Sequence, residues 1–234
     1  MSQSFPSPAP IPSRSPLWFR RLIGFTVILT LCLIMLGAYV RLTDAGLGCP
    51  DWPGCYGKLF PTQAKEQIAQ AVADQGGEHG PVSMGKAWRE MVHRYIAKIL
   101  GLLIIAIAIV AWRKREQLGQ SPALPIWLVG VVILQGLFGM WTVTLLLKPA
   151  IVTGHLLGGL ITFSLLLWLW LRQLPQPRYV DAEPVASLAG PALLGLVAAA
   201  VQIFLGGWTS TNYAALACTD LPTCQGQWWP EMNF

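Results

Sequence analysis

The feature that most constrains this chain is a set of long segments without a charged side chain. Residues 22–40, 125–147, 149–171 and 184–208 contain no Asp, Glu, Lys or Arg. About 20 apolar residues of helix are needed to cross the hydrocarbon of a bilayer, so each segment is long enough to span it. Only 12% of all residues are charged, against about 25% in soluble domains. We expect an all-α integral membrane protein, built as a helical bundle.

A fifth spanning helix is less obvious from the sequence. Residues 99–112 are apolar but too short to cross a bilayer alone. The helix must therefore extend back through Met91, with its start between Ser83 and Arg89. This extension places His93, Arg94 and Lys98 in the outer membrane region. Five transmembrane helices are predicted in all.

The basic residues predict the orientation, because Lys and Arg accumulate in cytoplasmic loops. With the N-terminus in the cytoplasm, one side collects Arg14, Arg20, Arg21, Arg113, Lys114, Arg115, Arg172 and Arg178. The other side then holds the loop 41–85, the turn at Lys148 and the tail from Thr209. We interpret the net charge of +5 as a topology signal and expect no nucleic-acid partner, only membrane lipid around the helices.

Four cysteines form two pairs on the predicted outer side. Cys49 and Cys55 share the first outer loop, and Cys218 and Cys224 share the tail. Paired thiols on an exported face favour local disulfides, Cys49–Cys55 and Cys218–Cys224, over a metal site, since no histidine lies nearby. Cys32 stands alone in the first helix, where we expect it to be a small buried apolar residue.

An internal repeat joins the first and fifth helices. At a constant offset of 169, ten of the 26 positions from Leu36 to Pro61 are identical, including both cysteines. We predict a cytoplasmic tail (1–21), a first four-helix repeat (22–171) with outer loop 41–85, a cytoplasmic linker (172–187), and the first helix and loop of a second repeat (188–234). The second copy is incomplete, which favours a truncated chain over one that pairs with a separate half.

Two of the three histidines lie in predicted spanning helices, where an imidazole needs a partner. His93 and His155 would sit within about two turns of the outer end of separate helices. That arrangement could grip a haem iron, with Gly101, Gly154, Gly158 and Gly159 leaving room for the ring. Interhelical hydrogen bonds explain the histidines equally well. Glu90 precedes His93 by three residues, so both share a helix face.

Five short motifs together resemble the haem A synthase family. They are residues 37–43 (GAYVRLT) before the cysteine loop, 90–95 (EMVHRY), 142–149 (TVTLLLKP), 155–159 (HLLGG) and 206–213 (GGWTSTNY). The resemblance covers residues 19–234.

The resemblance implies an eight-helix protein of two four-helix halves that oxidises the C8 methyl of haem O to a formyl group, giving haem A for terminal oxidases. It implies that His93 and His155 are axial haem ligands, that Glu90 is the catalytic carboxylate, and that the Cys49–Cys55 disulfide lies near the haem edge. Haem b would belong to the second half. Haem O synthase and oxidase assembly factors would be partners, in the bacterial plasma membrane rather than the mitochondrial inner membrane.

Three questions stay open at this point. Arg94 could pair with Glu90, bind a haem propionate or contact a lipid phosphate. A membrane thiol-disulfide oxidoreductase would also carry outer cysteine pairs, but it would normally need a reactive Cys-x-x-Cys, which is absent. A bis-histidine haem b protein that only transfers electrons explains the histidines but gives Glu90 no task.

Overall fold

A computed structural model describes residues 15–77, 80–175, 187–220 and 222–229. Within these ranges the regular structure is helical, and five helices are long and apolar enough to cross a membrane. They are α1 (Leu17–Leu42), α3 (Met84–Arg113), α5 (Ala123–Thr144), α6 (Pro149–Leu171) and α8 (Ala189–Thr211). The predicted all-α membrane bundle is confirmed. The tail before residue 15 and most of the 172–187 linker lie outside the described ranges.

The helix starts and ends differ from prediction where charged residues meet the membrane boundary. α1 begins at Leu17 rather than Leu22, because Arg20 and Arg21 continue the helix where polar headgroups can solvate them. α3 begins at Met84, inside the predicted window, and the Ser83 hydroxyl caps it by accepting a hydrogen bond from the Lys86 amide at 3.2 Å. α5 ends at Thr144, before the predicted Leu147, in a turn with positive φ at Leu146 and Leu147.

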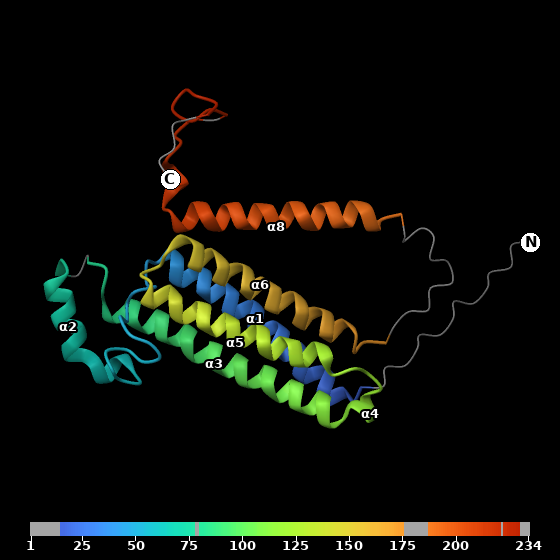
Figure 1. Cartoon of the computed structure of the whole chain (residues 1–234). Coiled ribbons are helices and arrows are strands. Elements are labelled where there is room, and N and C mark those ends of the chain that lie inside the picture. Colours follow the sequence, from blue (N-terminus) through green and yellow to red (C-terminus); the bar gives the residue numbers. More distant parts are fainter. Residues whose placement is uncertain (1–14, 78–79, 176–186, 221, 230–234) are drawn as a thin grey trace, which may run out of the picture.

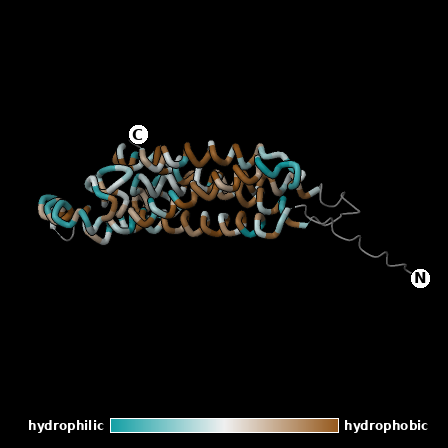
Figure 2. The backbone as a smooth tube through the Cα atoms, turned by 90° about the horizontal axis from the view of Figure 1, so that it is seen from below, coloured by the Kyte–Doolittle hydropathy of each residue, from teal (hydrophilic) through white to brown (hydrophobic). Residues whose placement is uncertain are grey.

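Helices α1, α3, α5 and α6 form a four-helix bundle in which α1 and α5 each contact both α3 and α6 (Figure 1). Their shared core consists of buried aliphatic side chains together with one aromatic, Phe19 of α1. Hydrophobic residues also cover most of the outside of the helices, whereas hydrophilic residues gather toward the ends (Figure 2). A surface of this kind suits lipid as the surrounding solvent.

A small extramembrane layer covers the end of the bundle where α3 begins. It contains the short helices η1 (Pro61–Ala64) and α2 (Lys65–Asp74), which contact α3 (Figure 1). Ile68 of α2 packs with Val82 and with Ala87 and Met91 of α3 against the Cys49–Cys55 pair. This layer is therefore a second hydrophobic cluster, separate from the bundle core.

Helix α8 packs along α6 near its own C-terminal end. Gly207 lies against Leu156 and Thr153, and the Thr153 and Thr211 hydroxyl oxygens are 3.4 Å apart. Only Gly207 and Thr211 of this helix are buried. The start predicted for this helix, residue 184, lies outside the described ranges.

Two contacts join residues that are equivalent in the repeat. The Arg41 guanidinium donates to the Ser210 carbonyl at 2.5 Å, and the Tyr213 hydroxyl contacts the Asp44 carboxylate at 3.1 Å. Each pair is separated by 169 residues, the repeat offset. The ends of α1 and α8 therefore meet through equivalent positions of the repeat.

Cys32 corrects one expectation, because its side chain is exposed on the outside of α1 rather than buried. α1 is apolar on all sides, so neither its composition nor its periodicity distinguishes an inward from an outward position.

Candidate functional site

The site begins with the loop that follows α1. The Asp51 carboxylate accepts hydrogen bonds from the backbone amides of Tyr56 at 2.5 Å and Gly57 at 2.8 Å, and Cys55 pairs with Lys58 through the backbone. These bonds close the turn and bring Cys49 and Cys55 to a Cα–Cα distance of 4.8 Å, joined as a disulfide. The predicted Cys49–Cys55 bond is confirmed.

The second cysteine loop repeats this construction. Asp220 accepts from the amides of Gln225 at 2.7 Å and Gly226 at 2.9 Å, and Cys218 is joined to Cys224. The second predicted disulfide is confirmed. Zinc binding needs free thiolates, so the metal alternative for the cysteine pairs is wrong. The repeat therefore preserves the loop structure as well as the sequence.

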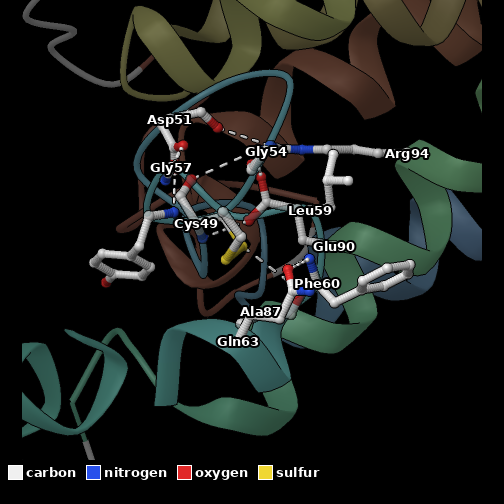
Figure 3. The surroundings of a disulfide bond; sticks show 12 residues. Cys49, Asp51, Gly54, Gly57, Leu59, Phe60, Gln63, Ala87, Glu90 and Arg94 are labelled. Carbon is white, nitrogen blue, oxygen red and sulfur yellow. Dashed lines mark hydrogen bonds and ion pairs between the residues drawn. A yellow bond between two sulfur atoms is a disulfide. The ribbon is translucent and has the colours of Figure 1, made fainter. Parts of the chain in front are cut away.

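The first loop lies directly on the helix that carries the predicted site. A Cβ added at Gly48 would be 2.7 Å from the backbone nitrogen of Ala87, closer than real Cβ contacts. Glycine allows the loop backbone to reach the first turn of α3. One consequence is that the Cys49 amide donates to Oε2 of Glu90 at 2.9 Å (Figure 3).

Glu90 and Arg94 form a buried ion pair beneath this loop. Their side chains are 6% and 8% exposed, and the Arg94 guanidinium donates to Oε1 of Glu90. Arg94 also donates to the carbonyls of Asp51 at 2.7 Å and Gly54 at 2.6 Å (Figure 3). A buried charge pair is tolerable only when hydrogen bonds satisfy the remaining polar atoms, as they do here.

These contacts decide part of what the sequence left open for Arg94. The guanidinium pairs with Glu90, and a lipid-phosphate contact is wrong, because the side chain is buried under protein. A propionate contact of Arg94 stays a prediction. Lys98, which the sequence places in the outer membrane region, lies with Nζ 5.7 Å from the ring centre of Tyr95.

The two histidines face glycines on neighbouring helices. Nε2 of His93 would be 3.0 Å from a Cβ at Gly37 of α1, and Cε1 of His155 would be 3.2 Å from one at Gly139 of α5. α3 and α6 each contact both of these neighbouring helices, α1 and α5. α3 and α6 therefore bring the two predicted ligands into one region of the bundle.

Neither imidazole forms a hydrogen bond with a residue that the structure describes, so the interhelical hydrogen bonds offered as an alternative are not seen there. Nδ1 of His155 is buried without a partner. Buried polar nitrogens are normally satisfied, so an orphaned one indicates a binding role. The His155 backbone is held instead, since its carbonyl accepts from Nε2 of Gln135 at 2.7 Å.

The glycines predicted to leave room for a ring have other neighbours. Gly154 lies against Phe138, Gly158 and Gly159 lie against Gln135, and Gly101 faces open space. Gly37 and Gly139 are the glycines beside the histidines.

Asp51, Gln135 and Arg89 also lie around the site without having been assigned a role from sequence. The sequence does contain a signal for Asp51, because the same residue recurs as Asp220 at the equivalent position of the repeat.

Two half-buried imidazoles from separate helices, without hydrogen bonds to the described part of the chain, are a donor set that suits a haem iron. No cluster of three or more His, Cys, Asp or Glu side chains that could hold a bare metal ion occurs within the described ranges. The haem hypothesis therefore fits the residues present better than a mononuclear metal site does.

The chain is similar to several proteins that are named heme A synthase. It is 48% identical to a heme A synthase of Shewanella oneidensis over 90% of this chain and 62% of that protein. It is 30% identical to a heme A synthase of Halalkalibacterium halodurans over 90% of this chain and 64% of that protein. It is 28% identical to a heme A synthase of Hyphomonas neptunium over 91% of this chain and 65% of that protein.

The chain thus spans less than two thirds of the length of these relatives. Residues 20–234 match the family described as "Cytochrome oxidase assembly protein" (COX15-CtaA). That match covers all five spanning helices except the first turn of α1, together with both cysteine loops, and the chain belongs to this cytochrome oxidase assembly protein family.

Proposed function

We propose that the bundle of α1, α3, α5 and α6 is the haem O site of a haem A synthase, where the C8 methyl is oxidised to a formyl group. The observation that carries this proposal is the pair of half-buried imidazoles, His93 and His155, which form no hydrogen bond to a described residue, with Nδ1 of His155 itself buried. Haem O would supply the ring methyl, and the protein would supply ligands and a fixed charge. The name of the relatives supports the same activity.

His93 and His155 would hold the iron, and the Gln135 contact would fix the backbone of His155. Such outer contacts orient a metal ligand. Glu90 would act near the reacting carbon. Removal of hydride equivalents from the methyl group, which an external electron acceptor would take up, develops positive charge on that carbon. A preorganised carboxylate can stabilise this charge and orient the water molecule that supplies the formyl oxygen. Its two hydrogen-bonded oxygens keep Glu90 in one orientation.

The topology and the partners follow from the same proposal. The basic residues favour a cytoplasmic N-terminus, which would place both cysteine loops on the outer side of a bacterial plasma membrane. Residues 22–171 would form the first repeat and residues 188–234 the start of the second, and a complete second repeat would hold haem b. Haem O synthase would deliver the substrate, and oxidase assembly factors would receive haem A.

Haem typing of the purified chain tests this function. We expect protein expressed with haem O to carry haem through His93 and His155, so His93→Ala and His155→Ala lose haem or change its spin state. His79→Ala is the matched control, because this histidine lies outside the apolar segments. Unchanged optical and paramagnetic spectra in both site variants would refute the ligation.

Conversion is tested in a longer protein, in which the chain is joined to the part of the Shewanella oneidensis relative that lies outside the matched region. We expect haem A in extracts of the longer protein. Bound haem that cycles reversibly without any haem A would instead identify an electron-transfer protein. Quinone-dependent thiol oxidation would favour a disulfide oxidoreductase.

A further inference from the structure

Arg89 lies one helical turn before His93, on the same face of α3. Its guanidinium carbon is 5.6 Å from the ring centre of Tyr39 on α1. Tyr39 comes two residues after Gly37, the residue that faces His93. Arg89 and His93 therefore face the same helix, at successive levels, with Arg89 nearer the outer end.

The other arginines at this end of the bundle already have partners. Arg41 pairs with Asp44, and Arg94 pairs with Glu90. Arg89, which is half-buried, forms no ion pair and no hydrogen bond within the part of the chain that the structure describes; the Tyr39 ring is its only interaction there. A partly desolvated guanidinium with five unused donors is suited to a carboxylate, which it can bind through two parallel hydrogen bonds.

A haem offers such carboxylates on one edge. When two helices grip the iron from opposite faces, the ring stands between them, and its charged propionates belong at the polar end rather than in hydrocarbon. Arg89 is closer to that polar end than His93 is. We propose that Arg89, positioned by the Tyr39 ring, binds a propionate carboxylate of the haem held by His93. This inference rests on the proposed haem site.

The test compares iron protoporphyrin IX with its dimethyl ester, in which both carboxylates are masked. Each compound is titrated into the haem-free 234-residue chain in detergent, and binding is followed by the Soret band. Wild-type protein should prefer the free acid. Arg89→Gln should weaken binding of the free acid on the order of tenfold, as expected for loss of a charged hydrogen bond, and leave the ester unchanged.

Two further variants separate the propionate contact from general effects. Lys98→Gln removes the same charge from an exposed position on the same helix and should leave the preference for the free acid intact. Arg89→Lys keeps the charge but loses the planar guanidinium that can donate two parallel hydrogen bonds. This variant should recover part of the preference for the free acid. Equal thermal stability of Arg89→Gln and wild type shows that the variant is folded.

Two results would overturn the inference, and they can be told apart. If Arg89→Gln weakens both compounds equally, or if wild type does not distinguish them, Arg89 has only a packing role while the haem site stands. If His93→Ala leaves the bound spectrum unchanged, the haem lies elsewhere and the proposed function fails together with the propionate contact.

Discussion

The backbone amide of Cys49 donates a hydrogen bond to Oε2 of Glu90, with 2.9 Å between the two atoms. The other carboxylate oxygen accepts from Arg94, and Arg94 reaches back to the loop carbonyls of Asp51 and Gly54 (Figure 3). The orientation of the carboxylate is therefore determined by a loop that a disulfide closes. Anything that loosens the loop should disturb the carboxylate, and loss of the ion pair should loosen the loop.

The first prediction concerns the role of Glu90 in turnover. Glu90→Gln keeps the shape of the side chain but removes its charge. We expect the protein extended into a second repeat to retain bound haem and to lose haem A formation, because the proposed role of Glu90 is to act on the reacting carbon rather than on the iron. Pigment extraction measures both quantities. Glu66→Gln, on the exposed face of α2, is the control, and a normal haem A yield from Glu90→Gln would remove this residue from the mechanism.

The second prediction concerns the coupling of Glu90 with Arg94. Either single change to Gln leaves a buried charge without its partner, which typically costs about 3–5 kcal/mol. The double variant removes both charges and should recover part of that loss. Thermal denaturation in detergent of the wild type, the two single variants and the double variant completes a double-mutant cycle. Additive losses would show that the two side chains do not stabilise each other.

Much of the fold could be predicted because membrane spans follow from local composition. Charge-free segments identified four of the helices, and the need for sufficient length extended the fifth through His93 to its Ser83 cap. The bounds of α1 could not be predicted, because charged residues do not end a helix at the membrane surface. The orientation of Cys32 also required the structure, since α1 is apolar on every face.

The site was predictable in part for a related reason. Helical spacing alone indicated that Glu90 could meet Arg94, and the two do pair. The carbonyl partners of Arg94 depend on how Asp51 folds a loop far away in the sequence, which no periodicity describes. The neighbours of the histidines, Gly37 and Gly139, come from packing between helices and were equally inaccessible to local patterns.

The third prediction concerns pH. Hydrogen bonds from the Thr223 hydroxyl and then from the amides of Gly226 and Gln225 hold the pKa of Asp220 below its ordinary value. The contribution of the ionised carboxylate to the turn is therefore complete above the usual aspartate range, and it is lost only as the pH falls through the lowered pKa. Amide chemical shifts of Gly226 should titrate below that usual range. Thr223→Val should raise the midpoint, and Asp220→Asn should abolish the titration; a midpoint at or above the ordinary value would contradict the hydrogen-bonded turn.

The last prediction concerns the two disulfides, which share a loop design but differ in exposure. Cys49 and Cys55 are fully buried between α2 and α3, whereas Cys218 is exposed in the tail. A reductant must reach a sulfur atom, so Cys218–Cys224 should open first in the folded chain. Timed reduction, alkylation and peptide mass spectrometry give both rates from one sample. Arg94→Gln should accelerate opening of Cys49–Cys55 selectively, because it removes the contacts that hold the loop on α3, while Cys218–Cys224 serves as the internal control. Equal rates in the wild type, or equal acceleration of both bonds, would show that the ion pair does not hold the first loop closed.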